Sequence, residues 1–113
     1  MPELNETEKI YLLALSRYGL SAQIDMVFEE FAECQKELCK FLRGKRDPKA
    51  IAEEIADCEI MLDQMKQFLS LKKEVELYKK KKITRLAKRL VDHQEPELEE
   101  VSHEEDIQRA YDK

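Results

Sequence analysis

Hydrophobic residues along this chain recur at intervals of three and four, the spacing that places side chains on one face of an α-helix. The pattern predicts four helices, over residues 6–17, 22–42, 48–69 and 71–91. Two glycines and three prolines leave long stretches without helix breakers, and no segment has the pattern of a strand. We therefore expect an all-α fold, a bundle of four main helices.

Residues suited to capping a helix precede each predicted helix: Asn5, Ser21, Asp47 and Ser70. Between the first two helices, Gly19 can supply the left-handed residue that ends a helix. Pro48 directly follows Asp47, and proline at the first helical position is a strong start signal. The local signals thus agree with the hydrophobic pattern about where the helices begin.

The second and third predicted helices are joined by only about five residues, so we expect them to be antiparallel neighbours. At about 100° per residue, the apolar stripe of the second helix centres on Phe31 and Leu38. That of the third centres on Cys58 and Met65, and Glu54 falls inside it. A glutamate in an apolar stripe is costly unless it is paired or bound to a metal ion.

Two acidic clusters lie on these helices at matching depth. Glu33 lies about 12 residues before the centre of the turn and Asp57 about 12 after it, so at 1.5 Å per residue they reach a similar level. Glu30 and Glu54 flank that level. Four carboxylates gathered at one point repel one another and need a compensating cation, most simply Mg²⁺.

With 113 residues and 13.4 kDa, the chain is long enough for one core. We expect a helical domain over 1–92 and an acidic tail over 93–113, with at most a short helix capped by Ser102. The net charge of −5 hides an asymmetry, because 72–89 is strongly basic and 95–106 holds acids without lysine or arginine. The basic stretch suits a phosphate-bearing ligand.

Neither a membrane span nor a signal peptide is expected from the sequence. The three cysteines fall within helical patterns, which favours reduced thiols in a cytoplasmic protein. A zinc site is poorly supported, because no two cysteines are separated by two residues and the histidines, at 93 and 103, lie far from all three.

The acids carry a resemblance to a known family. The order Glu29-Glu30-x-x-Glu33, a gap of twenty residues, then Glu54-x-x-Asp57 resembles the signature of the MazG-like all-α nucleoside triphosphate pyrophosphohydrolases. The similarity covers roughly residues 18–90 and is greatest to the small stand-alone members of phages and bacteria. It implies hydrolysis of a nucleoside triphosphate between its α- and β-phosphates.

The resemblance also implies roles for individual residues. Glu30, Glu33, Glu54 and Asp57 would be the ligands of Mg²⁺, with Mn²⁺ as a substitute. Glu29 would help to hold a second metal ion or orient the attacking water, a catalytic role. Such a carboxylate beside a metal-bound water can accept its proton.

Phosphate-binding residues are expected on the last helix, where Lys81-x-x-x-Arg85 has the family's spacing. Lys82 and Lys88 compete for the lysine role, because the register of a lysine run is ambiguous. Arg85 is favoured most, since its forked donors suit phosphate oxygens.

The base is not identified by the sequence, which contains no tryptophan to stack on it. Gln23 could form a hydrogen bond to a base edge. Tyr18, Tyr11 or Phe28 could stack on a base, although each also suits a core position.

Family members form dimers or tetramers, so a homodimer or homotetramer is expected. Met26, Met61 and Phe68 lie off the main stripes and suit a second buried face.

Two other classes of function stay open: a non-catalytic helical module for nucleotide or protein binding, and nucleic-acid binding through 72–89. The latter is opposed by the overall acidity and by the lack of interleaved aromatic residues other than Tyr78.

Overall fold

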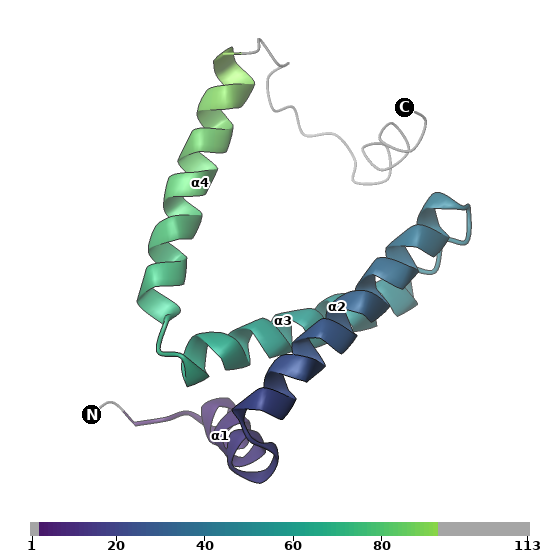
Figure 1. The fold of residues 1–113 in the computed structure, drawn as a ribbon. Helices are drawn as coiled ribbons and strands as arrows, with labels where there is room; N and C mark the ends of the chain where they lie inside the picture. Colours follow the sequence, from purple (N-terminus) through teal and green to yellow (C-terminus); the bar gives the residue numbers. More distant parts are fainter. Residues whose placement is uncertain (1–2, 93–113) are drawn as a thin grey trace. The chain divides into compact units, whose positions relative to one another are not determined.

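The computed structural model describes residues 3–92, and within them it contains four helices and no strand (Figure 1). They are α1 (Glu6–Tyr18), α2 (Leu20–Leu42), α3 (Pro48–Phe68) and α4 (Lys72–Asp92). The prediction of an all-α chain with four helices is confirmed. None of these helices is long and apolar enough to cross a membrane. The predicted tail, 93–113, lies outside the described residues.

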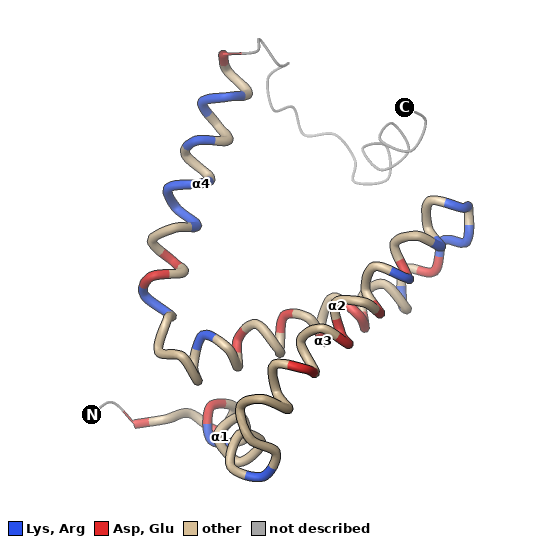
Figure 2. The backbone as a smooth tube through the Cα atoms, in the orientation of Figure 1, with Lys and Arg blue, Asp and Glu red and all other residues tan. Residues whose placement is uncertain are grey.

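The chain divides into two compact units, one ending at Val75 and the other beginning at Glu76. The first unit is built on α2 and α3, which pack side by side after the short turn that joins them (Figure 1). The second unit contains α4 from Glu76 onward, and every described side chain in that part is exposed. Lysine and arginine recur along it (Figure 2).

Two of the predicted caps are confirmed by hydrogen bonds. The Asn5 side chain accepts a bond from the backbone N–H of Glu8 at 2.8 Å, and the Glu8 carboxylate accepts one from the N–H of Asn5 at 3.1 Å. This reciprocal pair is a capping box, which satisfies otherwise unpaired donors at the start of α1. At α3, Asp47 accepts from the N–H of Ala50 at 3.2 Å, with Pro48 in the first helical position.

The other two predicted caps are wrong. Ser21 lies inside α2, because that helix begins at Leu20, directly after Gly19, which has the predicted positive φ of 83°. Ser70 itself has a φ of 54° and ends α3 rather than starting α4. The N–H groups of Ser70 and Leu71 donate to the carbonyls of Gln67 and Lys66, at 3.2 and 2.8 Å, which is the Schellman pattern of a helix end.

The packed face of α2 differs from the predicted one. Phe31 and Leu38, the expected stripe centre, remain 38% and 46% exposed. The buried and half-buried side chains of α2 instead include a series with the spacing of a two-helix seam: Gln23, Val27, Glu30, Cys34, Glu37 and Phe41. Because this seam contains polar residues, a prediction based on apolar residues alone placed the packed face on the neighbouring side of the helix.

On α3 the packed face agrees better with the predicted stripe. Cys58 and Met65 are half-buried, and the half-buried Glu54 lies among them. Met61 is the one buried hydrophobic side chain among the described residues, and its buried companions are Gln23 and Gln64. The core of the isolated chain is therefore small and partly polar.

Candidate metal centre

Three carboxylates meet where α2 and α3 run side by side. One oxygen each from Glu30, Glu54 and Asp57 lies within 4.8 Å of the other two. Glu30 comes from α2 and the other two from α3, where a spacing of three residues keeps them on one side. The acidic segments of both helices are visible in Figure 2.

Burial and mutual repulsion perturb two of these groups. Burial chiefly raises the pKa of Glu30, and the charges of Asp57 and Glu54 raise it further, with a hydrogen bond between Glu30 and Asp57. The pKa of Glu54 is also raised, first by burial and then by the charge of Asp57 and of Glu33. Each group is thus held in a place that favours a neutral carboxyl or a bound cation.

Glu54 adds a second observation. Its Oε2 atom is enclosed and has no hydrogen-bond partner among residues 3–92. An enclosed carboxylate oxygen without a donor is costly, and a coordinated cation would remove that cost. Hard divalent cations such as Mg²⁺ and Mn²⁺ take oxygen ligands, so the donor set fits the predicted metal.

The remaining predicted acids lie around the cluster. Glu33 is exposed and is not one of the three converging carboxylates, but its charge acts on Glu54. Glu29 is also exposed, and its charge acts on Glu30. The sequence register had placed Glu33 level with Asp57, whereas the structure brings a carboxylate oxygen of Glu30, about one helical turn away, within 4.8 Å of one of Asp57.

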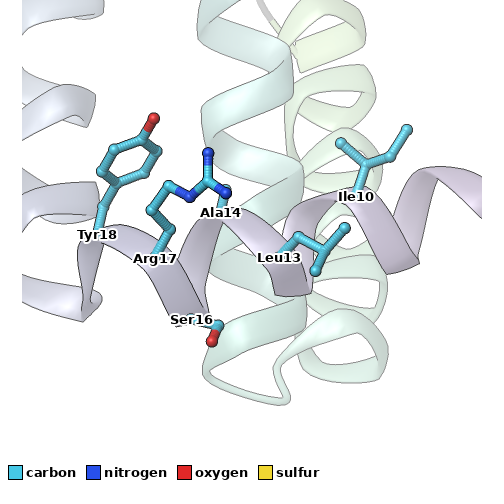
Figure 3. A pocket seen from close by; sticks show the side chains of 6 residues that line it. All are labelled: Ile10, Leu13, Ala14, Ser16, Arg17 and Tyr18. Atoms are coloured by element: carbon cyan, nitrogen blue, oxygen red, sulfur yellow. The ribbon is translucent and has the colours of Figure 1, made fainter.

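The two predicted base-binding residues have different surroundings. Gln23 is buried, with only 6% of its surface exposed. Tyr18 is 61% exposed and lines an open hollow of about 420 Å³ along α1, together with Ile10, Leu13 and Arg17 (Figure 3). Gln23 does not line that hollow, so the structure does not bring the pair together there.

The predicted phosphate-binding residues, Lys81, Lys82 and Arg85, are exposed on α4 and belong to the second unit. The ammonium group of Lys81 lies 5.7 Å from the ring centroid of Tyr78 on the same helix. Their role at the acidic cluster stays a prediction.

Sequence reasoning missed the thiol pair beside the cluster. The Sγ of Cys58 donates to the backbone carbonyl of Glu30 at 3.3 Å, and it also forms a side-chain hydrogen bond with Cys34. Burial, followed by the neighbouring Cys34, raises the pKa of Cys58 to about 11. The spacing of Cys34 on α2, four residues after Glu30, was the available signal.

Gln64 was also missed. It is 8% exposed, and its Oε1 atom is enclosed without a hydrogen-bond partner among the described residues. It lies seven residues after Asp57 on α3, which is two helical turns along nearly the same face.

Comparisons of the chain with protein-family models, with curated proteins and with solved structures found no match.

Proposed function

We propose that the chain is a Mg²⁺-dependent, MazG-like nucleoside triphosphate pyrophosphohydrolase, which cleaves a (d)NTP to the monophosphate and pyrophosphate. The observation that carries the proposal is the convergence of Glu30, Glu54 and Asp57, together with the unpartnered oxygen of Glu54. The order and spacing of the acids, which resemble the family signature, supply the reaction class.

In this proposal Glu30, Glu54 and Asp57 hold the metal, and Glu33 joins them from the neighbouring turn of α2. When bound, Mg²⁺ would offset the charge of the triphosphate and lower the pKa of a coordinated water. Glu29, exposed beside Glu30, is the candidate to accept a proton from the attacking water. Lys81, Lys82 and Arg85 would contact the phosphates.

A panel of dNTPs and NTPs with Mg²⁺, scored for both pyrophosphate and orthophosphate, tests the reaction. Monophosphate and pyrophosphate are expected. Diphosphate with orthophosphate would indicate another class of enzyme. Saturable nucleotide binding without turnover would favour the alternative, a non-catalytic helical binding module.

Asp57→Asn should lower turnover by orders of magnitude, because it keeps the shape of the side chain but removes a charged ligand. Glu59→Gln is a matched control, since Glu59 is an exposed acid on the same helix and outside the cluster. Normal turnover by Asp57→Asn at ordinary Mg²⁺ would show that the carboxylate assignment is wrong.

Metal binding has a readout that does not need catalysis. Millimolar Mg²⁺ or Mn²⁺ should raise the melting temperature, and EDTA should reverse the shift. Glu54→Gln should abolish the shift while the helical content remains, and Glu59→Gln should preserve it. Identical melting curves with and without Mg²⁺ would count against a preformed site.

We further propose that the protein assembles as a homodimer or homotetramer. Within residues 3–92 only Met61 is a buried hydrophobic side chain, whereas large apolar residues remain exposed on α2 and α3. On α2 these include Phe31, Leu38 and Leu42, and on α3 they include Ile55 and Leu62. Apolar faces of this kind are typical of subunit contacts.

A further inference from the structure

The level at which α2 and α3 pass each other follows from two contacts of Glu30: a carboxylate oxygen lies within 4.8 Å of one of Asp57, and its backbone carbonyl accepts from the thiol of Cys58 at 3.3 Å. Because the helices are antiparallel and rise equally per residue, equal steps away from Glu30 and Asp57 identify residues at the same level. Met26, four residues before Glu30 on α2, therefore lies at the same level as Met61, four residues after Asp57 on α3. By the same rule, Gln23, seven residues before Glu30, lies at the same level as Gln64, seven residues after Asp57.

The three most buried residues of the described chain lie on these two levels: Met61 at 6%, Gln23 at 6% and Gln64 at 8%. Met26, on the α2 side, is 39% exposed. The levels beside the acidic cluster thus combine thioether side chains with two buried amides. Thioethers are adaptable and favour contact with aromatic rings.

The amide of Gln64 is not accounted for by packing alone. Its oxygen is enclosed, and no hydrogen bond to it is formed by residues 3–92. Buried side-chain oxygens of folded proteins almost always have a partner, and leaving one unpaired costs about 1–3 kcal/mol. Gln67, one turn later, also has an unpaired oxygen, but its Nε2 donates to the carbonyl of Glu8 at 3.1 Å and so has a role in attaching α1.

The distance from the acids to the amides suits a nucleoside. Seven residues of helix rise by about 10 Å, the length scale between the 5′ oxygen of a nucleoside and the far edge of its base. A phosphate chain at Glu30 and Asp57 would therefore direct the base along Met26 and Met61 towards the glutamines.

We propose that Gln23 and Gln64 form the subsite that reads the base edge of the nucleotide, with Met26 and Met61 against the ring. The inference rests on the proposed pyrophosphohydrolase function and extends it to base recognition. A glutamine amide presents a donor and an acceptor side by side, which matches the paired donor and acceptor of a nucleobase edge. Gln64 is then a specificity-determining residue. Its Oε1 atom, which is unpaired in the free protein, accepts a hydrogen bond from the base of the bound nucleotide.

The test compares Gln64→Leu with the wild type across nucleoside triphosphates that differ only in the base. The wild type should show a preference in KM. Gln64→Leu should reduce that preference by roughly tenfold, the size of one hydrogen bond, with kcat nearly unchanged. Gln64→Glu, which keeps an acceptor but replaces the amide donor by oxygen, should change which base is preferred.

Gln67→Leu is the matched control, because it replaces the same residue type on the same helix but should leave base preference intact. Melting of each variant with Mg²⁺ and inorganic pyrophosphate, which has no base, should match the wild-type shift if the fold and the metal site are preserved. Turnover with equal KM for all bases in the wild type, or an unchanged preference in Gln64→Leu, would overturn the subsite while leaving the proposed reaction standing. Absence of any turnover or nucleotide binding would overturn both.

Discussion

At the scale of single residues, the most informative groups are those whose environment opposes their charge. Glu30 and Glu54 are half-buried carboxylates surrounded by other acids, and both have raised pKa values. Glu8 is the opposite case, because the ammonium group of Lys72 lies 2.6 Å from its carboxylate and lowers its pKa. The chain therefore has two kinds of carboxylate with opposite linkage to pH.

These shifts predict how stability depends on pH without metal. Glu30 and Glu54 bind protons more tightly in the folded state, so their contribution is fully present below the usual pKa of 4.5 and is lost as pH rises through their raised values. Melting temperature should rise as pH is lowered from 7 towards 4.5. Below 4.5 it should fall, because Glu8 loses its contact with Lys72 as it is protonated.

Thermal melts across this pH range check the sign. Glu54→Gln should flatten the slope between pH 7 and 4.5, and Mg²⁺ should flatten it too by compensating the same charges. Glu59→Gln should leave the slope unchanged. A melting temperature that rose steadily from pH 4.5 to 7 would contradict this account.

Ser70 gives a second prediction at this scale. A non-glycine residue with a φ of 54° carries a steric cost that glycine avoids. Ser70→Gly should therefore stabilise the folded state by about 0.5–1 kcal/mol. Gly44, which has a φ of 90° at the end of α2, provides the mirror test: Gly44→Ala should destabilise. Urea melts of the two variants should shift in opposite directions.

At the scale of helices, the sequence predicted the features that depend on residues close together in the chain, namely helix starts and the pairing of α2 with α3. The cap at Asp47 and the start at Pro48 needed only adjacent residues, and the acids converge because a short turn makes α2 and α3 antiparallel. The rotation of α2 could not be predicted in this way. Its seam includes Gln23, Glu30 and Glu37, and a pattern based on apolar residues assigns such positions to the surface.

The helical seam also determines thiol chemistry. Cys34 and Cys58 face each other across it, whereas Cys39 is exposed on α2. Since the thiolate is the reactive form, a pKa of about 11 should make Cys58 react far more slowly than Cys39 with a thiol reagent at neutral pH. Counting modified cysteines over time checks this. Cys39→Ser should remove the fast phase and leave the slow one.

At the scale of the whole molecule, the small polar core and the exposed apolar faces bear on assembly. Light scattering at micromolar concentration should return a multiple of 13.4 kDa. Leu38→Lys should shift the population towards the monomer, because it places a charge on an apolar face of α2. Ala22→Lys adds the same charge to an exposed position on the opposite side of that helix and should leave assembly unchanged. A wild type that scatters as about 13 kDa would exclude obligate assembly.

Glu8 has a consequence for how the protein opens. Its carboxylate closes the N-terminal capping box of α1 and meets Lys72, while its carbonyl accepts from Gln67 near the end of α3. Fraying at the start of α1 therefore releases contacts at the end of α3 and the start of α4 at the same moment. Amide protons at these distant points of the sequence should exchange with solvent as one cooperative unit, separately from those of the α2–α3 seam.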